Sequence, residues 1–258
     1  MKKLIFILLC FCLMTFGSSA RIIEVAPAGA WGVLGISGGG AVAAGGECSP
    51  GTDATIISTQ DITGQTSPFS LTIPADTTAI YFFWSYFYNG DGQGLNVAST
   101  TIATVASDPQ HEAPGETDQT GTGVAAWYNG TCHAAGSATF AWAFDQAPSE
   151  GPVMAIVYVK GGNTSTWTDV GSDQGGISQA VFVTVNSVTS SLVIAFNQRY
   201  GATPDLPSGW TNVMTTAAAA GEYARLSYAT APGAATTRFD SEGTEAFESV
   251  VVVSIPDL

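Results

Sequence analysis

Two acidic stretches of the sequence have the composition of a calcium site. The turn Asn89-Gly90-Asp91-Gly92 and the loop expected at residues 169–173 place carboxylate and amide oxygens beside glycines. Ca²⁺ binds such hard oxygen ligands, and glycine lets backbone carbonyls converge on the ion. The same dipeptides also form ordinary turns, because Asn-Gly and Asp-Gly supply positive φ angles. The candidate calcium ligands are Asn89, Asp91, Asp169 and Asp173.

Several aromatic residues at predicted loops or strand ends have the character of a carbohydrate-binding surface. An aromatic face stacks on a sugar ring, while nearby Asn, Asp and Gln side chains bond the hydroxyls. Aromatic residues at strand ends also pack against cores, so a structural role is the alternative for each. The candidates are Trp127, Tyr128, Trp167, Tyr200 and Trp210.

The sequence contains no diagnostic catalytic motif. Residues 35–39 read Gly-Ile-Ser-Gly-Gly, the pattern of a nucleophile elbow, but an elbow needs a strand and a helix in an α/β sheet. Paired carboxylates would suit a polysaccharide hydrolase, and Asp145 and Glu248 lie on predicted strands. Both sit at strand ends, where we expect ordinary solvated side chains. The sequence therefore favours a protein that is not an enzyme.

Residues 1–20 are predicted to be a secretory signal peptide. Lys2 and Lys3 precede an apolar run, and small residues follow up to a cleavage site after Ala20. We therefore expect a secreted, extracellular or surface-exposed protein. The leader holds two of the seven basic residues and none of the 21 acidic ones. The remaining acidic chain would repel phosphate backbones and anionic membranes, which argues against nucleic-acid binding.

Two cysteines, Cys48 and Cys132, remain after the leader. In an oxidising compartment we expect them to form a disulfide, which would stabilise the fold by about 4 to 5 kcal/mol on the loop-entropy model. A metal site using Cys132 and His133 is the alternative, but no second ligand pair accompanies them.

Residues 21–50 form a Gly/Ala-rich apolar arm. Val25 to Gly46 contains no charged residue and is long enough to cross a bilayer. Each of its many glycines would cost a helix about 1 kcal/mol, so we expect no stable membrane span after leader removal. An extended arm could instead add a strand to the sheet of a neighbouring subunit.

The rest of the chain, residues 51–258, reads as a single all-β domain without an internal repeat. The stretch Ile80–Tyr88 (IYFFWSYFY) has aromatics on both faces of a strand and is predicted to be its central strand. The alternative is that one face is a sugar-stacking platform. Short alternating runs separated by turn residues predict an antiparallel sandwich of about ten to twelve strands. The predicted strands are 54–59, 68–73, 79–88, 95–105, 122–129, 136–145, 153–160, 178–186, 191–198, 210–216, 223–230 and 247–255.

The second half carries a series of segments typical of a secreted module: GSATFAWAF, WTDVGSDQGG, SSLVIAFNQRYG, PSGWTNV and YARLSYATAPGAATTRF. This pattern resembles jelly-roll-like β-sandwich modules of secreted bacterial surface proteins and phage virion proteins. The resemblance implies a jelly-roll sandwich in a surface setting and no particular activity. We therefore expect a structural or interaction unit of a surface assembly, which self-associates or contacts other surface proteins. A carbohydrate-binding module that uses calcium is the alternative, and a polysaccharide hydrolase is the third.

Overall fold

The structure is a computed structural model, and it is all-β with antiparallel sheets. It describes residues 52–87, 97–108, 110–113, 120–128, 132–145, 151–162, 167, 169–175, 179–188, 190–218, 221–230, 236–241 and 247–257. In these ranges we find no helix that is long and apolar enough to cross a membrane. The predicted leader, residues 1–20, and the predicted arm, residues 21–50, lie outside the described residues.

The first half of the described chain forms two sheets. The five-stranded first inner sheet has the order β1-β9-β3-β7-β6, and the four-stranded first outer sheet has the order β2-β8-β4-β5. Their strands are β1 (Thr55–Asp61), β2 (Phe69–Ile73), β3 (Ala79–Phe87), β4 (Val97–Ile102), β5 (Val105–Ala106), β6 (Gln110–Ala113), β7 (Thr120–Tyr128), β8 (Gly136–Phe144) and β9 (Val153–Lys160).

The second half also forms two sheets. The five-stranded second inner sheet has the order β10-β16-β12-β14-β13, and the second outer sheet contains only β11 and β15. Their strands are β10 (Asp169–Gly175), β11 (Phe182–Asn186), β12 (Leu192–Tyr200), β13 (Thr211–Ala217), β14 (Glu222–Thr230), β15 (Thr236–Asp240) and β16 (Glu248–Ile255).

The two halves share one topology. We match β1, β2 and β3 to β10, β11 and β12, and β6, β7, β8 and β9 to β13, β14, β15 and β16, in sequence order. With this match, the inner-sheet orders β1-β9-β3-β7-β6 and β10-β16-β12-β14-β13 are the same. In the outer sheets, β2 and β8 correspond to β11 and β15, whereas β4 and β5 have no counterpart among the described strands. The described chain thus contains two consecutive copies of one fold. The sequence analysis missed this repeat.

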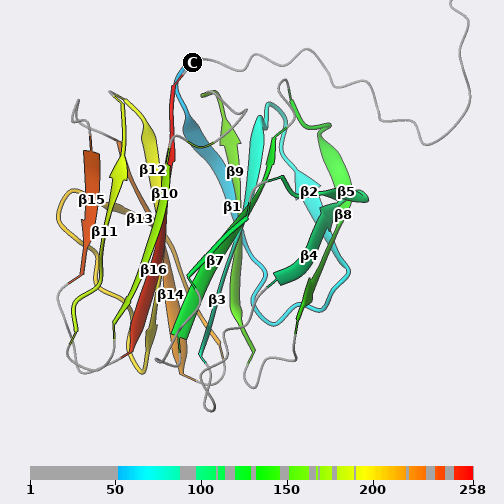
Figure 1. The fold of residues 1–258 in the computed structure, drawn as a ribbon. Helices are drawn as coiled ribbons and strands as arrows, with labels where there is room; N and C mark the ends of the chain where they lie inside the picture. The colour runs from blue at the N-terminus through cyan, green and yellow to red at the C-terminus, as the bar shows by residue number, and fades with distance from the viewer. Residues whose placement is uncertain are drawn as a thin grey trace, which may run out of the picture. The chain divides into compact units, whose positions relative to one another are not determined.

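The four sheets stack as layers, with the two inner sheets in the middle (Figure 1). A shared core lies between the inner sheets and contains residues such as Phe83, Phe196 and Val251. Each inner sheet also packs on its own outer sheet, through a first outer core around Phe140 and a second outer core around Phe239. Both inner sheets are therefore covered on both faces.

Strand β3 is the central strand that the aromatic run predicts. Tyr81 and Phe83 point into the shared core, whereas Phe82, Trp84 and Tyr86 point into the first outer core. The rings of Phe82 and Phe140 meet edge to face, with centroids 5.0 Å apart. Because both faces of β3 are buried, the sugar-platform alternative for this strand is wrong.

Each of the twelve predicted ranges overlaps a strand, but the described residues contain sixteen strands. The unpredicted ones are mainly β6, β10 and β15, which are short or rich in polar residues. The most important error concerns residues 169–173. We expected a calcium-binding loop there, but these residues form most of β10, which pairs with β16 along its whole length.

Candidate functional site

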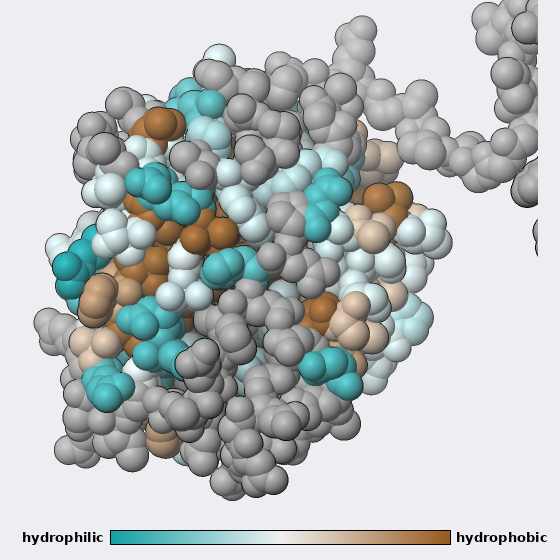
Figure 2. Space-filling model, in the orientation of Figure 1, coloured by the Kyte–Doolittle hydropathy of each residue, from teal (hydrophilic) through white to brown (hydrophobic). Residues whose placement is uncertain are grey.

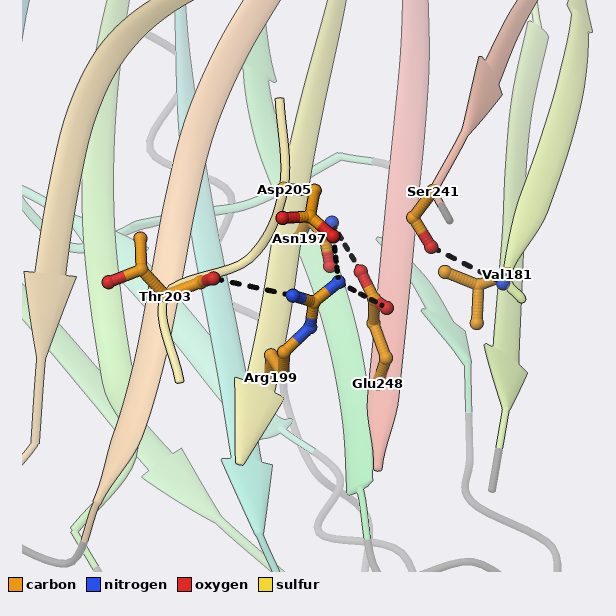
Figure 3. Close-up of polar contacts among 7 residues, drawn as sticks. All are labelled: Val181, Asn197, Arg199, Thr203, Asp205, Ser241 and Glu248. Carbon is orange, nitrogen blue, oxygen red and sulfur yellow. Dashed lines mark hydrogen bonds and ion pairs between the residues drawn. The ribbon is translucent and has the colours of Figure 1, made fainter. Parts of the chain in front are cut away.

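A buried ion pair lies on the second inner sheet (Figure 3). Arg199 of β12 and Glu248 of β16 are directly opposite each other, and the guanidinium Nη2 lies 3.0 Å from the carboxylate Oε2. The Asn197 side chain donates to the other carboxylate oxygen at 2.7 Å. Glu248 is completely buried. The expectation of a solvated carboxylate at Glu248 is therefore wrong.

The same guanidinium binds the connection between β12 and β13. Arg199 Nη2 also lies 2.9 Å from an Asp205 carboxylate oxygen, and Nη1 donates to the Thr203 carbonyl at 3.4 Å. Burial lowers the pKa of Arg199, but the hydrogen bonds and charges of Asp205 and Glu248 outweigh it and raise the pKa overall. The side chain therefore stays charged and ties the segment 201–210 to the sheet.

At the end of that segment, Trp210 packs in the second outer core. Its ring meets Phe239 edge to face, with centroids 5.1 Å apart, and it is only 8% exposed. The indole Nε1 donates to the Arg238 carbonyl of β15 at 3.3 Å. The prediction that Trp210 offers its face to a sugar is wrong, because that face is part of a core.

Two of the predicted calcium ligands bond the edge of β11 instead. The Asn186 backbone N–H donates to Asp169 Oδ2 at 2.7 Å, and its side-chain amide donates to the same oxygen at 2.8 Å. The Phe182 N–H donates to Asp173 Oδ2 at 2.9 Å. Gly171, between the two aspartates on β10, lets β10 and β11 approach this closely, because a Cβ there would lie 2.7 Å from a Val183 methyl group.

We found no group of three or more His, Cys, Asp or Glu residues that could hold a metal ion in the part of the chain that the structure describes. Asn89 and Asp91 lie outside the described residues, so calcium binding there stays a prediction. The Cys48–Cys132 disulfide also stays a prediction, because Cys48 lies outside the described residues. The segment 35–39, which has the nucleophile-elbow pattern, lies outside them as well.

The remaining aromatic candidates differ in exposure. Trp127 is buried in the first outer core, and its Nε1 donates to the Val105 carbonyl at 3.1 Å. Tyr128 and Trp167 pack against the shared core as half-buried side chains. Tyr200 is 36% exposed. Because Trp127 and Trp210 are buried in different cores, the five residues do not form one binding face.

The two histidines are held in polar contacts between elements. His111 of β6 lies with Nε2 3.1 Å from the Ser172 hydroxyl of β10, which links the edges of the two inner sheets. His133 Nε2 lies 3.2 Å from the Trp127 carbonyl. Burial lowers the pKa of both; the Asp169 charge opposes this at His111 and the backbone hydrogen bond opposes it at His133.

These lowered pKa values predict that acid destabilises the fold. The unfolded chain takes up protons near the ordinary histidine pKa of 6.5, whereas the folded histidines do so only at lower pH. Protonation therefore favours the unfolded state as pH falls below 6.5. We expect Tm to drop between about pH 7.5 and about pH 5.5, and to drop less in a His133→Gln variant. Equal pH slopes for the two proteins would contradict this assignment.

Some important residues were missed by the sequence analysis. Arg199, Asp205 and Arg238 were not candidates, although arginine is rare in this chain. An arginine three residues after the apolar run Leu192–Phe196, at the end of the same predicted strand, is the available signal, because a charge in a buried strand needs a partner. Comparisons with family models, with curated proteins and with solved structures found no match.

Proposed function

We propose that the protein is a non-enzymatic extracellular β-sandwich that serves as a structural and interaction unit of a cell-surface, filament or virion-surface assembly. The carrying observation is exposed apolar surface on the second outer sheet. Phe182 is 54% exposed, and Val188, just beyond the same strand, is 50% exposed. Figure 2 shows apolar surface among polar residues in the region where β10, β11 and β15 lie in Figure 1. Apolar surface of this kind is typical of contact sites between proteins.

A jelly-roll type for both halves is part of this proposal. In a jelly roll, consecutive strands alternate between two sheets, so each sheet collects strands that are distant in sequence. The orders β1-β9-β3-β7 and β2-β8-β4-β5 support this winding in the first half, and β10-β16-β12-β14 supports it in the second. Secretion through the leader remains the setting that we propose.

The contacts that the candidate acidic side chains make within the fold also support a structural role. Glu248 is engaged by Arg199 and Asn197, and Asp169 and Asp173 accept hydrogen bonds from β11. These groups hold strands and loops together. Carbohydrate binding is the second candidate function, favoured by the exposed ring of Tyr200 and by the half-exposed carboxylate of Asp205 nearby in sequence.

Light scattering after size exclusion tests the proposal. We expect residues 21–258 to form oligomers, and residues 47–258, which lack residues 21–46 of the arm, to be monomeric. Added calcium should change neither result. A monomeric 21–258 protein that binds a glycan array, and loses that binding in a Tyr200→Ala variant, would replace the proposal with the carbohydrate-binding alternative.

A further inference from the structure

The two outer sheets differ at one edge. In the first half, β8 pairs with β2 on one side and with β4 on the other. Its counterpart β15 pairs with β11 on one side, and no described strand pairs with its other side. A two-stranded sheet of five-residue strands is a small unit, which a third strand would extend.

The hydrogen-bond pattern shows which groups face this edge. The Ser241 N–H donates to the Val181 carbonyl at 3.0 Å, and the Val181 N–H donates to the Ser241 hydroxyl at 3.4 Å (Figure 3). Bonded and non-bonded pairs alternate along an antiparallel ladder. The pair of Phe239 and Val183 is therefore bonded, and the N–H and C=O groups of Arg238 point away from β11.

Equivalent carbonyls at this edge have different partners in the two halves. Thr139 of β8 and Arg238 of β15 each precede the buried phenylalanine of their outer core. The Thr139 carbonyl accepts the Ala103 backbone N–H at 2.8 Å, from the turn that follows β4. Among the described residues, the donor to the Arg238 carbonyl is a side chain, the Trp210 indole, at 3.3 Å. The indole thus bonds the carbonyl that a backbone N–H bonds in the first half, and a strand that pairs with this carbonyl must replace the indole bond.

The opposite edge of the second outer sheet is already occupied. Two of the three outward N–H groups of β11, those of Phe182 and Asn186, donate to the Asp173 and Asp169 carboxylates. Bonding of this kind protects an edge strand from further pairing. The outer edge of β15 is therefore the better acceptor for an added strand.

We propose that the outer edge of β15 accepts an extended strand from the arm of a second copy, within residues 25–46. The inference rests on the proposed function and names its contact. Residues 25–46 carry no charge, so they can approach a chain whose net charge is −14 without repulsion. Residues 21–51 precede the described chain, and an extended chain of that length reaches about 100 Å.

The arm also has the side chains that such a strand needs. In an extended strand, Trp31 and Val33 would lie on one face, and Leu34 and Ile36 would lie on the other. A strand at the β15 edge would place one of these faces toward the second outer core and expose the other beside Arg238, which is half exposed. Backbone pairing would supply the affinity, as in other strand-addition complexes.

A matched pair of variants tests the contact in residues 21–258. Arg238→Pro removes the outward N–H and leaves the ladder to β11 intact, because that N–H does not face β11. Arg238→Ala keeps the N–H. Both variants lose the cation–π contact with Phe182 and the ion pair with Asp240, so these losses cancel in the comparison. We expect Arg238→Pro to raise the dissociation constant of the oligomer by about tenfold or more, and Arg238→Ala to change it by less than about threefold.

Hydrogen exchange at the Arg238 amide provides a second readout if the proline variant does not fold. We expect protection in oligomeric 21–258 protein and fast exchange in residues 47–258. If oligomers need the arm but exchange at Arg238 is unchanged by it, the edge assignment is wrong while the proposed function stands. Arm-dependent protection in a monomer would also overturn the assignment, because the arm would then bind its own chain. A 21–258 protein that never associates would remove the proposed function itself.

Discussion

Replacing Glu248 with Gln is expected to lower the free energy of unfolding by about 3 to 5 kcal/mol. Glu248 is completely buried opposite Arg199, whose side chain is itself only 4% exposed. Desolvating two charges is costly, and the pair is tolerated because each charge compensates the other. In the variant, the buried guanidinium loses the carboxylate of Glu248 and keeps that of Asp205. Urea denaturation followed by circular dichroism measures the loss.

The matched control is Asp205→Asn, at the other end of the same guanidinium. The Asp205 side chain is 50% exposed, so water screens its contact with Arg199. We expect a loss within about 1 kcal/mol. Equal losses in the two variants would show that burial does not decide the energetics of this cluster.

Replacing Gly123 with Ala is expected to cost about 3 kcal/mol through overpacking. Gly123 of β7 faces the indole of Trp84 on β3, and an added Cβ would lie 2.2 Å from Trp84 Cζ2. Trp84 is completely buried and its ring stacks on Phe82 at 5.2 Å, so it has no free space into which to move. A lowered Tm is the expected result.

Two further variants separate this clash from a general effect of alanine. A Cβ at Gly151 would meet nothing within 4 Å, so Gly151→Ala should leave Tm nearly unchanged. In a Trp84→Phe background the smaller ring makes room, so adding Gly123→Ala should cost much less than it does in the parent protein. Additive losses in the double variant would contradict the proposed steric cause.

Alternation and turn chemistry were sufficient to predict most of the strands, but not β6, β10 or β15. β3 and β9 are long apolar runs, and β8 has regularly spaced aromatics, so their positions follow from sequence. β10 was missed because Asp169, Gly171 and Asp173 have the composition of a turn. Their local preference for a turn is overridden by pairing with β16 and by the N–H groups of β11.

Long-range partners explain most of the other errors. Glu248 and Arg199 are 49 residues apart, and nothing in the local sequence of Glu248 indicates a buried cation beside it. The repeated topology was also hidden, because its two halves share strand order and few residues. Phe140 and Phe239 each follow a Gly- and Thr-containing segment, which is the short similarity that remains. Trp210 was misassigned because a Gly-Trp turn gives no sign of whether the ring faces solvent or a core.

The most direct test of the proposed assembly role is sedimentation velocity of residues 21–258 over a wide concentration range. The proposed role predicts species larger than the monomer that increase with concentration and disappear when the arm is deleted. A single monomeric species at every concentration would contradict self-assembly through the arm.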